Sequence, residues 1–265
     1  MNDKLMDEQL RIGIEQLDSG DTQKAINTLE EYCRNHQDDA NSWFYLGDAV
    51  AEDGQIEKAV EHYRTGLKLA PSDLDALTTM GDLLFEAGKH EEAISCYRSV
   101  RELDPDDADA LVSIGLVYNS LERSDEAIAA YRQALAQEPD NIFALNALGD
   151  ALYAIGDSQG AVDAFQKAVD IDPTDPATHY NLGELLYDME ELEEAEDECR
   201  EAIRLDPTYS MAYLTLGGIC MDQDRTKDAI DSFELYLKNE KSPQARDMIA
   251  EVKAVIEGLK EELKG

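Results

Sequence analysis

The chain has 265 residues, of which 43% are hydrophobic, and a formal net charge of −36 from 59 acidic and 23 basic residues. This hydrophobic content is ordinary for a folded protein and excludes wholesale disorder. A surface this negative repels phosphate backbones and anionic lipid, so it argues against nucleic acid and membrane surfaces as partners and favours basic ones. Solubility or a saline cytoplasm is the alternative explanation of the charge.

Residues 1–5 form an N-terminal lead-in without the apolar stretch of a secretory signal. No run of 18 apolar residues occurs, so we expect no membrane insertion. The cysteines Cys33, Cys96, Cys199 and Cys220 have no CxxC spacing, which favours small buried side chains in a reducing compartment. These features predict a cytoplasmic protein.

A glycine recurs every 34 residues along most of the chain, and an alanine follows each one twelve residues later. The glycines are Gly13, Gly47, Gly81, Gly115, Gly149, Gly183 and Gly217, and the alanines are Ala25, Ala59, Ala93, Ala127, Ala161, Ala195 and Ala229. A fixed period in the range of ~20–50 residues is typical of a solenoid, in which each unit stacks on its neighbours to bury a core.

Placing the glycine eighth in the unit divides residues 6–243 into seven gapless units. They are 6–39, 40–73, 74–107, 108–141, 142–175, 176–209 and 210–243. In unit 74–107, Leu77, Met80 and Leu84 form one helical stripe, Gly88 indicates a turn, and a second stripe ends at Pro105. Each unit is therefore predicted to be a helix–turn–helix hairpin.

Glycine inside a helix costs ~1 kcal/mol relative to alanine, so its recurrence indicates that the two helices of each hairpin cross closely at the Gly–Ala pair. Polar residues just before the first helices can cap free backbone N–H groups. The candidates are Asp73, Asp107, Asn141 and Asp175, and Pro176 suits the first helical position.

The unit resembles the tetratricopeptide repeat. The second unit supplies that pattern with Trp43, Leu46, Gly47, Val50, Ala59, Tyr63, Gly66 and Pro71. The resemblance covers residues 6–243 and is poorest in the first unit, where Gln9, Gln16 and Gln37 replace apolar residues and proline. It implies an all-α, right-handed superhelical solenoid with a concave groove that binds peptides.

Residues 244–265 are predicted to form a capping helix, with Ser242 as its cap and Pro243 opening it. Its apolar stripe is expected to cover the last hairpin and consists of Met248, Ile249, Val252, Ile256, Leu259 and Leu263. An initiator methionine at one end and a cap at the other lead us to expect a whole protein.

On a helical wheel, places 2, 5, 9, 12 and 13 of each first helix point away from the hairpin. By the resemblance, this side is similar to the peptide-binding wall of the groove. The predicted peptide-binding residues are Phe44, Asp48, Glu52, Asp82, Phe85, Glu86, Asn119, Asn146, Asp150, Tyr153, Tyr180, Glu184, Tyr187, Leu214 and Met221. Asp75, Phe143 and Asp188 lie on the same side.

The first fourteen places of units two to seven contain eleven acids and no Lys or Arg. At the chain's overall frequency about seven bases would occur there, or about half that after allowing for core positions. This bias predicts a groove for a Lys/Arg-rich or amphipathic segment, held by ion pairs and cation–π contacts. The aromatic residues at places 5 and 12 can alternatively pack against the next hairpin. Because no lysine and no place-9 asparagine are present, the acidic tails of chaperones are disfavoured as ligands.

No catalytic residue, cofactor or metal site is predicted. His36, His62, His90 and His179 are scattered, and no phosphate-binding loop or nucleophile elbow occurs. The first hypothesis is a non-enzymatic protein-interaction scaffold. The alternatives are a self-assembling structural protein, by docking of one copy in the groove of another, and a regulatory subunit of an enzyme complex. Growth of oligomers with concentration would favour self-assembly.

Overall fold

The computed structural model describes residues 8–264. The predicted lead-in 1–5, residues 6 and 7 of the first unit and Gly265 of the cap lie outside the described residues. The range 8–264 contains fifteen α-helices, one 3-10 helix and no strand, so the predicted all-α class is confirmed.

The helices follow one another with short connections. Their bounds are α1 Glu8–Asp18, α2 Thr22–Asn35, α3 Ala40–Glu52, α4 Ile56–Leu69, α5 Leu74–Glu86, α6 His90–Leu103, α7 Ala108–Ser120, α8 Ser124–Gln137, α9 Ile142–Ala154, α10 Ser158–Ile171, α11 Pro176–Asp188, α12 Leu192–Leu205, α13 Ser210–Asp222, α14 Thr226–Asn239, η1 Pro243–Ala245 and α15 Arg246–Glu262.

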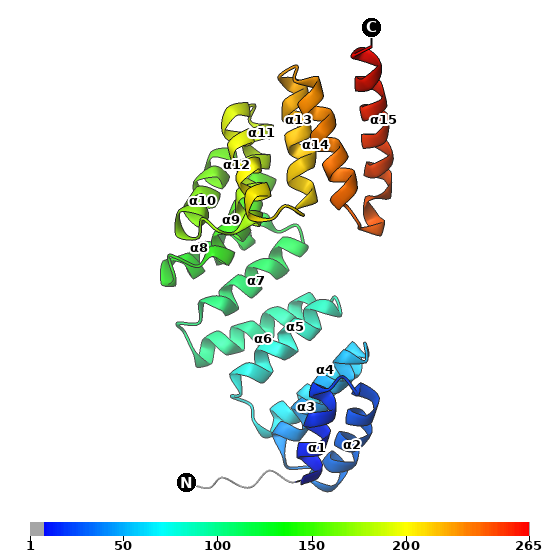
Figure 1. The fold of residues 1–265 in the computed structure, drawn as a ribbon. Helices are drawn as coiled ribbons and strands as arrows, with labels where there is room; N and C mark the ends of the chain where they lie inside the picture. Colours follow the sequence, from blue (N-terminus) through cyan, green and yellow to red (C-terminus); the bar gives the residue numbers. More distant parts are fainter. Residues whose placement is uncertain (1–7, 265) are drawn as a thin grey trace. The chain divides into compact units, whose positions relative to one another are not determined.

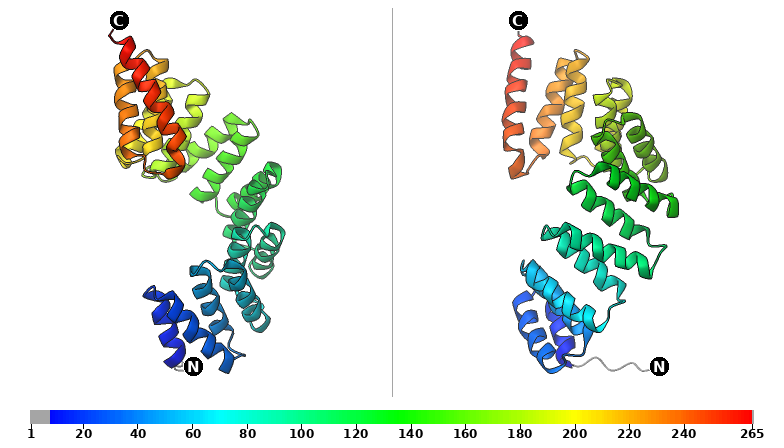
Figure 2. Two further views of the ribbon diagram at one scale, coloured as in Figure 1. Left: turned by 90° about the vertical axis from the view of Figure 1, so that its right-hand side faces the viewer. Right: turned by 180° about the vertical axis from the view of Figure 1, so that it is seen from behind.

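The chain divides into two compact units, Met1–Gln137 and Glu138–Gly265. In unit 1, α1 pairs with α2, α3 with α4, α5 with α6 and α7 with α8 (Figure 1). In unit 2, α9 pairs with α10, α11 with α12 and α13 with α14, and α15 packs on α14. Inside each unit the second helix of one hairpin contacts the first helix of the next (Figure 2). A hairpin therefore buries its apolar faces partly against itself and partly against its neighbour.

The recurring alanines and glycines lie where the two helices of a hairpin meet. All seven alanines from Ala25 to Ala229 are fully buried. A Cβ added at each of the seven recurring glycines would lie nearest to the side chain sixteen residues later. In five hairpins this side chain is an aromatic ring. At Gly47, the ring of Tyr63 is nearer than the Ala59 carbonyl. The small residue therefore makes room for a large side chain of the second helix, so the close approach involves this side chain more directly than the alanine.

The polar residues before the first helices are N-caps. Asp73, Asp107 and Asn141 accept a hydrogen bond from the backbone N–H three residues later, and Asp175 accepts from Ala177 and Thr178. Pro176 occupies the first turn of α11, where a missing N–H breaks no helical bond. These predicted helix starts are confirmed.

The hairpin turns share a left-handed residue at place 15 of the period. Gly20, Gly54, Gly88 and Gly156 have φ between +70° and +83°, and the same place is taken by Glu122, Glu190 and Asp224 at φ +57°, +63° and +56°. The following N–H then reaches back to a carbonyl five residues earlier, as from Lys89 to Leu84 at 2.8 Å. Gly88 is therefore a turn residue, as its position in the pattern predicts.

We expect Glu122→Gly, Glu190→Gly and Asp224→Gly each to stabilise the chain by up to about 1 kcal/mol. A non-glycine residue in the left-handed region costs ~1–2 kcal/mol, and the extra freedom of unfolded glycine cancels roughly half of that. The reciprocal change Gly88→Glu should destabilise, although no atom lies within 4 Å of where its Cβ would be. Urea unfolding midpoints measure all four variants; a less stable glycine variant would contradict this account.

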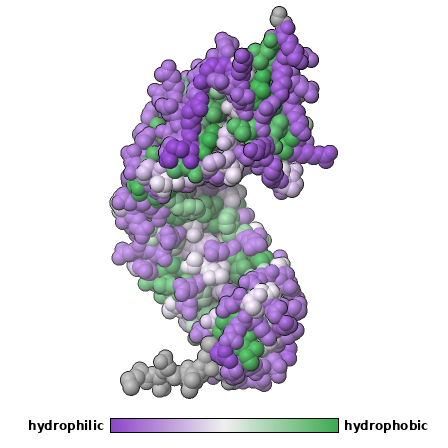
Figure 3. Space-filling view, in the orientation of Figure 1, coloured by the Kyte–Doolittle hydropathy of each residue, from purple (hydrophilic) through white to green (hydrophobic). Residues whose placement is uncertain are grey.

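The C-terminal cap differs in detail from the prediction. Ser242 caps the short η1, which Pro243 opens, and the α-helix itself starts at Arg246. Val252 and Ile256 are buried, whereas Met248 and Leu263 are 41% and 49% exposed. Only part of the expected apolar stripe is therefore buried. On the face shown in Figure 3, hydrophilic side chains cover most of the surface, with hydrophobic patches among them.

Candidate functional site

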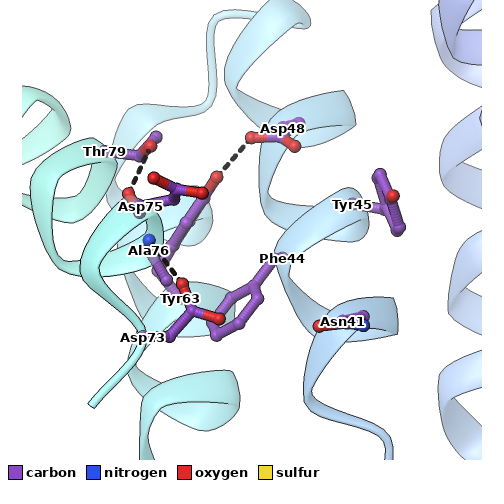
Figure 4. Close-up of a pocket in the computed structure, with 9 residues that line it drawn as sticks. All are labelled: Asn41, Phe44, Tyr45, Asp48, Tyr63, Asp73, Asp75, Ala76 and Thr79. Atoms are coloured by element: carbon purple, nitrogen blue, oxygen red, sulfur yellow. Dashed lines mark hydrogen bonds between the residues drawn. The ribbon is translucent and has the colours of Figure 1, made fainter. Parts of the chain in front are cut away.

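A cavity of about 360 Å³ opens between α3 and α5 of unit 1 (Figure 4). Two of the predicted binding residues, Phe44 and Asp48, line it. The other lining residues are Asn41, Tyr45, Tyr63, Asp73, Asp75, Ala76 and Thr79. The lining includes three carboxylates and three aromatic rings but no basic residue, so it suits a cationic group with apolar parts.

Asp48 and Tyr63 are joined by a hydrogen bond in which the tyrosine hydroxyl donates to the carboxylate. The ring of Phe44 stacks on that of Tyr63, with centroids 5.4 Å apart. Burial raises the pKa of Asp48, although the bond from Tyr63 opposes this shift. Burial and the neighbouring carboxylate raise the pKa of Tyr63, so its hydroxyl keeps its proton and remains a donor. An arriving cation would favour the charged form of Asp48 and so offset part of the cost of its desolvation.

A second cavity of about 280 Å³ lies next to the first along the first helices of unit 1. Asp75 and Thr79 line both cavities. The remaining residues of the second cavity are Thr78, Asp107, Asp109, Ala110 and Ser113. We call Asp48, Asp73, Asp75, Asp107 and Asp109 the acidic face of unit 1. It runs across α3, α5 and α7 without a basic residue in either lining.

The other predicted residues of unit 1 lie outside these cavities. Asp82 accepts a hydrogen bond from the hydroxyl of Tyr97 at 2.7 Å, as Asp48 does from Tyr63. The ring of Phe85 meets that of His90 edge-on at 5.7 Å and is half-buried. Glu52 accepts a long hydrogen bond of 3.4 Å from Thr22. Glu86 and Asn119 are exposed.

In unit 2, tyrosines link successive first helices. The hydroxyl of Tyr153 on α9 donates to Asp188 on α11, and that of Tyr187 on α11 donates to Asp222 on α13 at 2.8 Å. The bond to Asp188 raises the pKa of Tyr153, and burial together with Asp222 raises that of Tyr187 to about 12. Both rings are held in place by these bonds while one side remains accessible, 43% of Tyr153 being exposed.

Tyr180 has a different environment from the other two tyrosines. Only 7% of it is exposed, its ring lies 5.2 Å from that of Tyr209, and its hydroxyl donates to Glu184 at 2.7 Å. The alternative of packing between hairpins therefore describes Tyr180. Leu214 is half-buried and Met221 is 38% exposed.

Asn146, Asp150 and Glu184 lie on α9 and α11 of unit 2. The Asn146 amide donates to Thr178 at 2.8 Å, while its buried Oδ1 has no partner among the described residues. Asp150 receives no hydrogen bond from a tyrosine hydroxyl, because its hairpin has Phe165 at the position of Tyr63 and Tyr97. Desolvation and then the charge of Glu184 raise the pKa of Asp150. The buried Oδ1 of Asn146 can therefore accept a hydrogen bond from an incoming donor.

We expect Asp150→Asn to raise the melting temperature at pH 7, because the substitution removes a charge that is disfavoured in the folded state. A carboxyl whose pKa is raised on folding destabilises the fold above that pKa, and the cost disappears as the pH falls through it. The gain should therefore vanish below the unfolded pKa of about 3.9. Melting curves from pH 7 to pH 3 measure this, with exposed Asp197→Asn on α12 as the control. An equal gain at every pH would exclude the electrostatic explanation.

Several residues of these sites are missing from the sequence prediction. Tyr63, Tyr97 and Asp222 form hydrogen bonds with residues that were predicted to bind peptide. Thr79 lines both cavities. A tyrosine fifteen residues after an acid at place 9 occurs at Asp48 and Asp82, and this pairing is a signal that could have identified Tyr63 and Tyr97.

Between residues 8 and 264 no group of three His, Cys, Asp or Glu side chains is arranged to hold a metal ion. In the same range, no helix combines the length and apolarity needed to cross a bilayer.

Comparisons with known proteins agree with the fold of helical hairpins. A profile of the C-terminal domain of cilia and flagella-associated protein 70, a tetratricopeptide repeat profile by its name, matches residues 6–205. A general tetratricopeptide repeat profile matches residues 180–246. No curated protein sequence matches the chain.

Solved structures with the same fold include a tetratricopeptide repeat protein from Parabacteroides merdae, 17% identical over 92% of this chain and 97% of its own, with a TM-score of 0.71. YrrB, described as a TPR protein with an unusual peptide-binding site, is 21% identical over 70% of this chain and 95% of its own, with a TM-score of 0.56. MamA is 24% identical over 60% of this chain and 94% of its own, also with a TM-score of 0.56. The profile that spans residues 6–205, the recurring hairpins and these shared folds together establish that the chain belongs to the tetratricopeptide repeat family.

Proposed function

We propose that the protein is a non-enzymatic interaction scaffold and that the acidic face of unit 1 binds a Lys/Arg-containing, amphipathic segment of a partner protein. The observation that carries this proposal is the pair of adjoining cavities, which share Asp75 and Thr79 and whose linings contain five acids and no base. Stacked helical repeats commonly present extended binding surfaces, and YrrB supports the proposal as a relative with a peptide-binding site.

The two cavities differ in the groups they offer to such a segment. The first combines Asp48 with the rings of Phe44 and Tyr63, which suits an arginine that stacks on a ring while its guanidinium meets the carboxylate. The second combines Asp107 and Asp109 with the hydroxyls of Thr78 and Ser113, which suits a hydrated lysine or a backbone amide. A partner with basic residues next to an apolar one would use both cavities.

The test uses a fluorescent peptide, acetyl-Arg-Ala-Ala-Arg-Ala-Ala-Arg-amide, with the glutamine version as the neutral control. We expect the arginine peptide to bind and its affinity to fall with salt, since mobile ions screen charges over ~8–10 Å. Removing three charges of the acidic face with Asp48→Asn, Asp75→Asn and Asp109→Asn should weaken binding about tenfold or more.

A matched variant separates a site from the general charge of the chain. Glu57→Gln, Glu61→Gln and Asp125→Asn remove the same charge from exposed positions on second helices of unit 1. We expect this variant to bind within about threefold of the parent. Equal weakening by both triple variants would mean that the acidic face attracts cations no better than the rest of the surface, and the proposal would be wrong.

A further inference from the structure

A cavity of about 510 Å³ lies in unit 1 between α6, α7 and α8, with a lining different from that of the acidic face. Its apolar lining is formed by Leu111, Ile114, Tyr118, Ala129 and Ala130. Its polar lining is formed by Arg98, Arg101, Glu102, Glu126 and Gln133. None of these residues is among the predicted peptide-binding residues.

Within the described part of the chain, the two arginines of this cavity form no ion pair with a carboxylate. Arg98 donates to the Tyr118 hydroxyl at 3.0 Å, and Arg101 donates to the Pro105 carbonyl at 3.3 Å. The Nε of Arg101 is buried and has no partner among residues 8–264. Most other arginines of that range form an ion pair, namely Arg11, Arg34, Arg64, Arg123, Arg200, Arg204 and Arg225. Of the arginines without an ion pair in that range, Arg98 and Arg101 are the two that line this cavity.

The carboxylates of the lining do not replace the missing partners. Glu126 accepts hydrogen bonds from Arg123, at 3.0 Å from its Nε. Arg123 also lies over the ring of Tyr118, 4.6 Å from its centroid, which adds a third guanidinium near the cavity. Glu102 lines the cavity but lies beyond ion-pair distance of both Arg98 and Arg101. Two guanidinium groups therefore keep donors available beside an apolar surface.

Unit 2 contains a cavity built from the equivalent helices, and there the arginines are neutralised. It measures about 370 Å³ and is lined by Arg200 and Arg204 of α12, together with Asp228 and Asp231 of α14. Arg200 pairs with Glu196 at 2.6 Å, and Arg204 pairs with Glu201 at 2.5 Å. The arginines of the unit 2 cavity are thus paired with carboxylates of the chain itself, whereas those of the unit 1 cavity are not.

We propose that the cavity between α6, α7 and α8 is a second docking site, which takes a carboxylate-bearing, otherwise apolar segment of a partner protein. A Glu or Asp side chain can accept forked hydrogen bonds from Arg98 and Arg101, while neighbouring aliphatic side chains cover Leu111 and Ile114. The site is distinct from the acidic face and independent of the function proposed for it. The two surfaces together would let one scaffold hold partners of opposite charge.

The experiment uses hexanoate as the probe, with hexanol and hexylammonium as controls of the same length. Side-chain ¹H–¹⁵N spectra of the whole chain report the Nε–H signals of individual arginines. We expect hexanoate to shift the Arg98 and Arg101 signals saturably and to leave those of Arg200 and Arg204 unchanged. Hexanol should bind about tenfold more weakly or worse, because it carries no charge to meet the guanidinium groups.

Variants complete the test. Arg98→Gln with Arg101→Gln should weaken hexanoate binding about tenfold or more, whereas Arg132→Gln, an exposed arginine outside the cavity, should leave it nearly unchanged. Equal shifts at Arg200 and Arg204, equal binding of hexanol, or an unaffected double variant would each overturn the proposal. Shifts of the Arg98 and Arg101 signals that follow protein concentration without a probe would assign the cavity to a second copy and also overturn it. The hexanol comparison uses the unmodified chain, so it does not depend on the folding of the variants.

Discussion

Gly115→Leu is expected to lower the free energy of unfolding of its hairpin by roughly 3 kcal/mol or more. A Cβ at Gly115 would lie within 2.8 Å of three ring atoms of Tyr131, which is fully buried. Overpacking alone costs ~1–3 kcal/mol, and here α7 and α8 must also separate to admit the side chain.

The matched control for this variant is Gly258→Leu in α15. No atom lies within 4 Å of a Cβ at Gly258, so this change should stabilise α15 by up to about 1 kcal/mol through helix propensity. Because repeats need not unfold as one unit, hydrogen exchange of α7 and α8 should accompany the melting curve. An unchanged melting temperature and unchanged exchange for Gly115→Leu would contradict the account of the helix crossing.

Tyr180→Ala should destabilise unit 2 by about 3–5 kcal/mol, the usual cost of removing a large buried ring. It removes the contact with Tyr209 and the hydroxyl that donates to Glu184. Tyr180→Phe keeps the ring and should cost only about 1 kcal/mol, the value of one hydrogen bond. Urea unfolding of the two variants separates packing from hydrogen bonding.

The comparison with Tyr153→Ala tests whether the tyrosines of unit 2 have different roles. Tyr153 is 43% exposed, so its loss should cost much less stability than that of Tyr180. As ligand anchors, Tyr153 and Tyr187 are therefore better candidates than Tyr180, whose ring is not accessible. Equal stability losses for Tyr153→Ala and Tyr180→Ala would show that the difference in burial has no energetic meaning.

The sequence predicts a residue's position correctly where a single local requirement, such as a helix cap or a turn, determines the residue type. Asp73 and Asp175 cap helices because a side-chain oxygen at that place reaches the free N–H groups. The turn after α5 needs a residue with positive φ, and Gly88 adopts +70° there. Such local requirements repeat with the period, and the pattern predicts them unit by unit.

The sequence predicts the sites less well because they depend on pairs of side chains from different helices. A helical wheel puts places 5 and 12 on one side of the first helix, so it could not separate buried Tyr180 from exposed Tyr153. The cavity beside Phe44 exists because its neighbours across the gap, Ala76 and Thr79, are small. Glu122 takes the left-handed place of a glycine, which no propensity rule favours.

The contacts between helices have a consequence for how the chain is made. Within each compact unit, a helix packs mainly against the helices immediately before and after it in the sequence. A ribosome adding ~5–20 residues per second needs roughly 2–7 s for one 34-residue repeat, whereas helices and loops form in microseconds. Each hairpin of unit 1 therefore has time to pack on the preceding one before the next emerges. Little apolar surface then stays exposed during synthesis until residues far along the chain are made.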